Sequence, residues 1–243
     1  MRYLALACDY DGTLARDGHV DEPTLAALDR LLDSGRKLLL VTGRELPELR
    51  DVFPQLKLFD QIVAENGALL FAPATGAEKP LAEPPPQAFV DELRRRRVQP
   101  LAVGRVIVAT WRPNEHIVLD VIRDLGLELQ VMFNKGAIMV LHSGINKATG
   151  LIAALKAMSL SPDQVAGVGD AENDHAFLKL CGCGVAVANA LPLLKKDACF
   201  VTRGDHGAGV SELIDELIAD DLRKRPRSAR TEKNVQTLAT AGW

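Results

Sequence analysis

Four short groups of polar residues could do chemistry in this chain of 243 residues. They are the segment Asp9–Thr13, the dipeptide Thr42-Gly43, the single Lys147, and the segment Gly169–Asp174. The four aspartates that matter in them are Asp9, Asp11, Asp170 and Asp174. In one cleft these carboxylates would repel one another unless a cation lay between them. An all-oxygen ligand set suits Mg²⁺, whereas zinc prefers thiolates and imidazoles, so we expect Mg²⁺ here.

A complementary anion site is predicted beside this metal. Lys147 supplies a positive charge, and Thr42-Gly43 supplies a hydroxyl group and backbone amides. A metal, a lysine and an aspartate together are the groups used in phosphoryl transfer through an aspartyl-phosphate. Arg44 and Asn66 stand close behind two predicted strands and are possible substrate-binding residues.

Short apolar runs precede most of these polar groups and are typical of strands buried in a parallel sheet. The predicted strands are residues 2–8, 37–41, 61–64, 164–168 and 184–187. The predicted helices are residues 21–34, 46–52, 147–158 and 174–180. Strands that alternate with helices indicate an α/β fold with a doubly wound parallel sheet, in which functional groups gather at the carboxyl ends of the strands.

The pattern changes between residues 81 and 142. A proline-rich connector at 80–86 leads into predicted helices at 87–97 and 114–125 and predicted strands at 105–111, 127–133 and 137–141. The last two strands flank the turn Asn134-Lys135-Gly136. We therefore expect a core of residues 1–80 and 143–221, a small inserted α+β domain of residues 81–142, and a basic tail of residues 222–243.

Composition limits the class of protein. A hydrophobic fraction of 47% and a charged fraction of 25% are those of a globular chain, and no apolar run approaches the roughly 18 residues of a membrane span. The first residues carry no recognisable secretory signal, and the four cysteines are expected to be free thiols, so we predict a cytoplasmic protein with no membrane partner.

Charge is unevenly distributed along the chain. The tail of residues 222–243 holds six basic residues and one acidic residue, so with a total of −3 the remainder carries −8. An acidic body argues against nucleic-acid binding, and the expected partner is a small phosphate ester. The sequence does not predict the oligomeric state.

The polar groups, as they stand, resemble the haloacid dehalogenase (HAD) superfamily of phosphohydrolases. Asp9–Thr13, Thr42-Gly43, Lys147 and Gly169–Asp174 match its four motifs in order. Further similarity at Glu65–Gly67, at 185–189 and at 205–209 points to its Cof-like sugar-phosphatase branch, type IIB. In that branch a cap domain is inserted between the second and third motifs, where this chain has its short α+β insertion.

The resemblance implies a role for each matching residue. The implied catalytic residues are Asp9 as nucleophile, Asp11 as general acid and base, and Lys147. The implied metal ligands are Asp9, Asp11 through its backbone, Asp170 and Asp174, the last either as a ligand or as support for Lys147. The implied phosphate-binding residues are Thr42, Gly43, Lys147 and Asn173.

The favoured function is a Mg²⁺-dependent phosphomonoester hydrolase that forms an aspartyl-phosphate. Its substrate would be a small phosphorylated metabolite, either a sugar phosphate or a molecule like phosphoglycolate. Two alternatives remain at this stage. One is a phosphomutase, which the short cap disfavours because a mutase must exclude water. The other is a non-catalytic phosphate-binding module whose tail docks to a partner.

Overall fold

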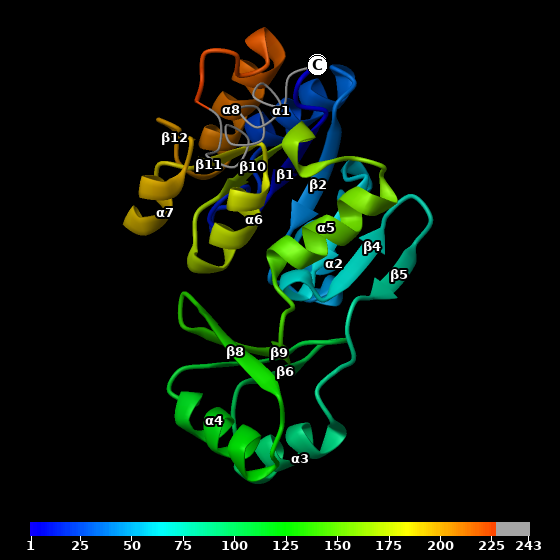
Figure 1. Ribbon diagram of the computed structural model, residues 1–243, viewed down its shortest axis with the longest axis vertical. Coiled ribbons are helices and arrows are strands. Elements are labelled where there is room, and N and C mark those ends of the chain that lie inside the picture. The colour runs from blue at the N-terminus through cyan, green and yellow to red at the C-terminus, as the bar shows by residue number, and fades with distance from the viewer. Residues whose placement is uncertain (227–243) are drawn as a thin grey trace, which may run out of the picture.

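The computed structural model describes residues 1–226, and its main feature is an eight-stranded sheet (Figure 1). Side by side, the strands are β12 (Phe200–Val201), β11 (Cys183–Ala186), β10 (Val165–Gly169), β1 (Ala5–Cys8), β2 (Lys37–Val41), β3 (Gln61–Ala64), β4 (Leu69–Ala72) and β5 (Ala77–Pro80). Neighbours from β12 to β3 are parallel, and β4 and β5 are antiparallel additions. The predicted doubly wound sheet is confirmed.

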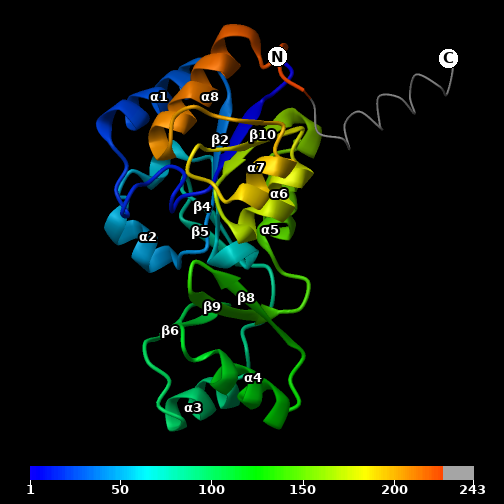
Figure 2. The same ribbon diagram turned by 90° about the vertical axis from the view of Figure 1, so that its left-hand side faces the viewer.

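Helices cover both faces of this sheet (Figure 2). On one side lie α1 (Glu22–Asp33), α2 (Leu46–Val52) and α8 (His206–Asp220), and on the other lie α5 (Lys147–Ala157), α6 (His175–Leu180) and α7 (Pro192–Asp197). Short 3₁₀ turns occur as η1 (Leu56–Leu58), η2 (Glu65–Gly67), η3 (Pro162–Gln164) and η4 (Glu172–Asp174). Because β1, β2 and β10 are covered on both faces, they are almost entirely apolar and buried.

The inserted segment forms a separate small α+β lobe, the cap (Figure 1). Its antiparallel sheet has the order β6 (Leu101–Val103), β7 (Val108–Trp111), β9 (Ala137–His142) and β8 (Leu129–Asn134). Helices α3 (Gln87–Arg95) and α4 (Glu115–Asp124) pack on the face that points away from the core. The cap sheet therefore turns its other face toward the core.

The packed core extends further along the chain than the sequence predicts. The side chain of Leu222 is 1% exposed and belongs to the main hydrophobic cluster. Arg225 binds the carboxylate of Glu216 and lies over the ring of Phe200. The predicted start of the tail at residue 222 thus falls inside the packed region, because apolar burial and an ion pair hold residues 222–225. Residues 227–243 of the tail lie outside the described part.

Among residues 1–226, no helix combines the length and apolar character that crossing a bilayer would demand.

Candidate active site

The candidate site begins at the point where the strand order of the sheet reverses. Asp9 directly follows β1, and Asp170 directly follows the neighbouring β10, with Cys8 level with Val168 in the register. In open α/β sheets this switch point leaves a crevice outside the carboxyl ends of the strands. Both aspartates are nevertheless almost buried, at 4% and 2% exposure, so their charges need partners.

Three carboxylates meet in this crevice. Asp9, Asp170 and Asp174 each offer one oxygen atom, and these oxygens lie within 4.8 Å of one another. Asp174 also accepts hydrogen bonds from the backbone amides of Asp170 and Ala171, both at 2.9 Å, which fixes the loop after β10.

This donor set fits a hard divalent cation. All the side-chain atoms of the cluster that could bind a metal are carboxylate oxygens. Nearby, the buried amide oxygen Oδ1 of Asn173 has no hydrogen-bond partner among the described residues. A site built for zinc would instead present thiolate or imidazole groups. The crevice can therefore hold a divalent metal.

Lys147 is the internal counter-ion of the cluster. Its ammonium group donates to Asp9 Oδ1 at 2.5 Å and to Asp174 Oδ1 at 2.6 Å, and its side chain is 1% exposed. Burial opposes the charge on Lys147, but the carboxylates of Asp174 and Asp9 outweigh it and raise its pKa above the ordinary value. Lys147 therefore stays charged at neutral pH.

The pKa of Asp9 moves in the opposite sense to that of a simple salt-bridged acid. Burial and the nearby carboxylate of Asp174 raise it well above the usual range, and the ammonium of Lys147 only partly offsets them. A cation bound among these oxygens would favour the ionised form, which is the form that can attack phosphorus.

Local sequence explains why Lys147 points into the cluster. Asn146 caps α5 by accepting hydrogen bonds from the amides of Ala148 and Thr149, which makes Lys147 the first helical residue. Gly67 packs against this helix start, since a Cβ there would lie 2.0 Å from the carbonyl oxygen of Asn146. Only glycine allows that approach, and its φ of +106° suits glycine as well.

The carboxylate of Asp11 is held away from the other three. The guanidinium group of Arg44 binds it with two hydrogen bonds of 2.7 Å, and Arg44 also pairs with Glu48. Such a two-pronged ion pair is strong and directional. The sequence predicted that four aspartates would lie in one cleft. Only three of their carboxylates form the cluster, because the carboxylate of Asp11 pairs with Arg44 instead. Arg44, which the sequence offers as a substrate-binding residue, thus contacts Asp11 in this structure.

The loops after β2 and β3 supply the anion-binding side. The hydroxyl of Thr42 is buried and accepts a hydrogen bond from the amide of Arg44 at 3.1 Å. A Cβ on Gly43 would lie 3.7 Å from Nδ2 of Asn173, so its bare backbone leaves open space beside that amide. Asn173 donates to Oδ1 of Asn66 at 3.0 Å. The structure thus gathers Thr42, Gly43, Asn173 and Asn66 on one wall, whereas Lys147 lies among the carboxylates.

The cap contributes a cation that the sequence did not single out. Lys135, at the tip of the β8–β9 hairpin, donates to Asp170 Oδ2 at 2.6 Å and to the carbonyl oxygen of Asp11 at 3.2 Å. Burial disfavours its charge, but the hydrogen bond to Asp170 and the nearby Asp9 and Asp174 raise its pKa overall. The turn itself was predicted, but 124 residues separate Lys135 from Asp11, so no local signal placed it here.

Gly12 makes room for this contact. It has a φ of +87°, and a Cβ there would lie 2.5 Å from both Asp170 Oδ2 and Lys135 Nζ. Its carbonyl oxygen accepts a hydrogen bond of 2.7 Å from Asn189.

Glu65 ties the cap to the core. Its fully buried carboxylate accepts hydrogen bonds from the backbone amides of Arg105, Val106 and Ile107 at 2.7–2.9 Å. These amides belong to the turn between β6 and β7, so a core residue directly after β3 holds a loop of the cap. Sequence reasoning included Glu65 only as part of a motif and did not assign it this role.

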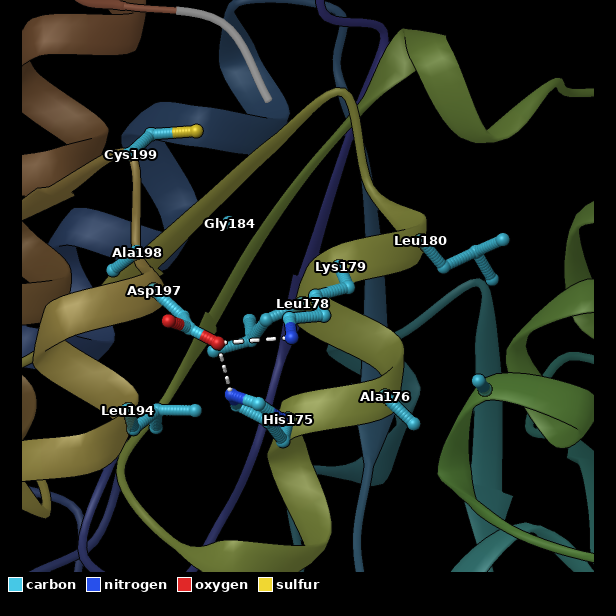
Figure 3. A pocket seen from close by; sticks show the side chains of 11 residues that line it. His175, Ala176, Leu178, Lys179, Leu180, Gly184, Leu194, Asp197, Ala198 and Cys199 are labelled. Carbon is cyan, nitrogen blue, oxygen red and sulfur yellow. Dashed lines mark ion pairs between the residues drawn. The ribbon is translucent and has the colours of Figure 1, made fainter. Parts of the chain in front are cut away.

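A separate cavity of about 630 Å³ lies between α6 and α7 (Figure 3). His175 Nε2 and Lys179 Nζ both pair there with Oδ2 of Asp197, at 2.8 and 2.9 Å. None of the clustered carboxylates lines this cavity. His175 therefore lies beside Asp197 at the start of α6, apart from the clustered carboxylates.

Comparison with known proteins identifies the family. The sequence pattern of the haloacid dehalogenase-like hydrolases matches residues 6–94 and 129–214, which is most of the chain. The chain belongs to this family. It is thus an enzyme, a phosphatase-type hydrolase of the HAD superfamily, and the resemblance stated from its motifs is confirmed.

Curated relatives cover nearly the whole chain of this HAD-like hydrolase. Phosphoglycolate phosphatase 2 of Saccharolobus solfataricus is 27% identical over 226 residues, which are 91% of this chain and 95% of the relative. Phosphoglycolate phosphatase of Natronomonas pharaonis is 30% identical over 221 residues, or 86% of this chain and 96% of the relative.

Solved structures agree on the fold. A haloacid dehalogenase-like hydrolase from Bacteroides thetaiotaomicron superimposes with a TM-score of 0.73 at 18% identity, over 88% of this chain and 99% of that one. A protein of Thermoplasma acidophilum gives a TM-score of 0.73 at 16% identity, over 89% and 98% of the two chains.

Proposed function

We propose that this HAD-like hydrolase is a Mg²⁺-dependent phosphomonoester hydrolase of the cytoplasm that works through an aspartyl-phosphate on Asp9. The observation that carries the proposal is the buried Asp9 carboxylate, 2.5 Å from Lys147 and grouped with Asp170 and Asp174. A nucleophile, a fixed cation and a cation-binding oxygen cluster meet at one strand end, which is what in-line phosphoryl transfer requires. None of the four cysteines, all of which lie within residues 1–226, forms a disulfide bond, and this supports the cytoplasmic location.

In the first step an oxygen of Asp9 attacks phosphorus, and the bond from phosphorus to the leaving oxygen breaks. Asp11 in its protonated form, outside the ion pair with Arg44, donates its proton to that oxygen, so the product leaves as an alcohol. The ionised form is the one that Arg44 orients. Mg²⁺ held by Asp9, the Asp11 carbonyl and Asp170, with Asp174 beside them, would supply neutralising charge for the phosphoryl oxygens. Lys147 and the amides after Thr42 would bind those oxygens from the other side.

In the second step Asp11, now ionised, takes a proton from a water molecule. The resulting hydroxide attacks phosphorus, the bond to Asp9 breaks, and inorganic phosphate is released with Asp9 regenerated. Each group thus returns to its starting protonation state.

We further propose a small, carboxylate-bearing substrate, with phosphoglycolate the first to test. The named activity of the relatives supports this choice. So does the cap, because Met132 contacts Asn66 through its sulfur at 3.1 Å and the sulfur of Met139 lies near Gly43. Both contacts place cap side chains beside the phosphate-binding wall, where a bulky leaving group would meet them.

The test is phosphate release from phosphoglycolate and from p-nitrophenyl phosphate, with Mg²⁺ and again with excess chelator. We expect Mg²⁺-dependent turnover that the Asp9→Asn variant reduces by several orders of magnitude. The Asp29→Asn variant changes an exposed helical aspartate and serves as the control. Turnover of neither ester with Mg²⁺, or full turnover in chelator, would contradict the proposal.

A further inference from the structure

Lys135 is the one cap residue whose charged group reaches the acidic cluster among the described ion pairs. The hairpin that carries it pairs Asn134 with Ala137, so Lys135 and Gly136 form a two-residue loop. Both have positive φ, 48° and 92°, as in the tight turns that match the twist of a hairpin. A rigid turn therefore holds the lysine over the core, with its side chain 45% exposed.

The oxygens that Lys135 binds are those proposed for the metal. Its ammonium lies 2.6 Å from Asp170 Oδ2 and 3.2 Å from the Asp11 carbonyl oxygen. Mg²⁺ holds its oxygen ligands at about 2.0–2.1 Å and demands nearly octahedral geometry. An ammonium and a magnesium ion that share two ligand oxygens would overlap and repel each other, so only one of them can bind there at a time.

We propose that Lys135 competes with Mg²⁺ for Asp170 and the Asp11 carbonyl, and that it selects substrates by pairing with their carboxylate once Mg²⁺ has displaced it. The second half of this proposal rests on the function proposed above. Lys135 is thereby a specificity-determining residue whose availability depends on the metal.

The charges around the cluster favour this exchange. Lys147 and Mg²⁺ together carry three positive charges, which balance the three clustered carboxylates. The carboxylate of Asp11 is already bound by Arg44, and those of Asp9 and Asp174 by Lys147. A displaced Lys135 would thus find the nearby carboxylates of the described site satisfied, and an anionic group on the substrate would be its free partner.

The first experiment measures Mg²⁺ binding calorimetrically, without substrate, in 0.15 M salt. The Lys135→Asn variant suits the test because asparagine tolerates positive φ and forms the same kind of turn before glycine. We expect its dissociation constant for Mg²⁺ to fall about two- to fivefold, the range of a partly exposed ion pair. An unchanged or weakened affinity would overturn the competition.

Two further variants serve as controls for the measured Mg²⁺ affinity. Arg94→Gln removes an equal charge from the cap at an exposed site paired with Asp91, and it should leave Mg²⁺ affinity unchanged. Equal tightening in both variants would show a general charge effect and overturn the proposal. Lys135→Arg keeps the cation and should keep the wild-type affinity.

The second experiment compares phosphoglycolate with ethyl phosphate, which has a similar size but no carboxylate. We expect Lys135→Asn to lower kcat/KM for phosphoglycolate about 10- to 100-fold, as for loss of a hydrogen bond to a charged group, and to leave ethyl phosphate nearly unchanged. An equal loss of kcat/KM for both esters, or a loss for neither, would overturn the proposed selectivity.

Failure of the proposed function can be told apart from failure of this inference. If the wild type hydrolyses neither ester, the proposed function fails, and the calorimetric measurement still decides whether Lys135 competes with Mg²⁺.

Discussion

At the scale of single residues, the most informative feature is how differently the two aspartates of the first motif are held. Asp9 lies buried against Lys147, whereas the carboxylate of Asp11 is 40% exposed and gripped by Arg44. Two carboxylates in one loop with different environments are suited to different roles in one reaction. Arg44 is then a positioning residue, because it acts on the reaction through Asp11.

Replacing Arg44 by lysine removes the fork that orients Asp11 but keeps the positive charge. We expect kcat for p-nitrophenyl phosphate to fall about tenfold, part of the 10²–10⁴ that general acid–base catalysis contributes, with KM little changed. The slower second step should also let phosphorylated enzyme build up, which a purely structural defect would not do. Arg50→Lys, whose arginine pairs with Glu78 on the surface, is the control.

Residues were predictable where chemistry and local spacing coincide. Asp9, Asp170 and Lys147 follow from residue type and position at strand ends or a helix start. Lys135 does not, because its role depends on how a hairpin from another lobe lies over the core. The ion pair between Asp11 and Arg44 was not predicted either, because a contact between side chains of two loops leaves no periodic signal in the sequence.

At the scale of elements, the joint between core and cap rests on Glu65. Its carboxylate accepts three backbone amides from the turn 105–107, and Gly104 beside them has no room for a side chain, since a Cβ would lie 2.9 Å from that carboxylate. Charge-assisted hydrogen bonds to a buried carboxylate are among the stronger contacts in proteins.

The Glu65→Gln variant should loosen this joint without unfolding the core. An amide offers one acceptor oxygen in place of two, so at least one amide of the turn loses its partner, at a cost of about 1–3 kcal/mol. Hydrogen exchange should then accelerate about 10- to 100-fold at Val106 and Ile107 while β1 stays protected. Glu83→Gln, in the connector before α3, is the control. Unchanged exchange at the turn would contradict the assigned role.

Strand and helix prediction succeeded where hydrophobic patterning was strong. The ranges 37–41 and 61–64 agree with β2 and β3, and the helix 46–52 agrees with α2. The antiparallel strands β4 and β5 and the edge strand β12 were not predicted. β12 is only two residues long, and β5 is largely exposed, so neither carries the apolar run that marks a buried strand. β4 does carry such a run, so weak patterning does not explain why it was missed.

At the scale of the whole molecule, the end of α8 closes the core. Asp221 accepts hydrogen bonds from the amides of Arg2 and Tyr3 and from the guanidinium of Arg36, which is 3.0 Å away. Leu222 follows as a buried residue. The residues just before β1 and β2 and the end of α8 thus meet at one charged group.

The stable protein should therefore include residues 222–225. A chain that ends at residue 226 keeps their contacts and serves as the reference. Truncation after residue 221 removes buried Leu222 and the Arg225–Glu216 pair, and should lower the free energy of unfolding by about 2–5 kcal/mol, the range for loss of a large apolar side chain. Urea denaturation of the two truncated chains decides this. Equal stability of the two would refute the assignment of residues 222–225 to the core.

Because of Asp221, we also expect the free energy of unfolding to depend on pH. Burial would raise its pKa, but hydrogen bonds from the amides of Arg2 and Tyr3 and from Arg36 lower it below the ordinary value of 3.8. A depressed pKa adds stability above the unfolded pKa, and that stability is lost as pH falls through the folded pKa. We expect Asp221→Asn to destabilise the protein by about 3 kcal/mol at pH 7. The gap from wild type in urea melts should shrink below about pH 4, and a constant gap would contradict this origin.

The central claim is that Asp9 carries the phosphoryl group during turnover, and mass spectrometry after an acid quench tests it most directly. The Asp11→Asn variant, given p-nitrophenyl phosphate and Mg²⁺, should pass the first step more easily than the second, because an aryl leaving group needs no protonation whereas the attacking water needs a base. The account predicts an added phosphoryl mass on the peptide that contains residue 9, absent when Asp9→Asn is combined with it. Phosphoryl label on another residue, or normal turnover by Asp9→Asn alone, would contradict the account.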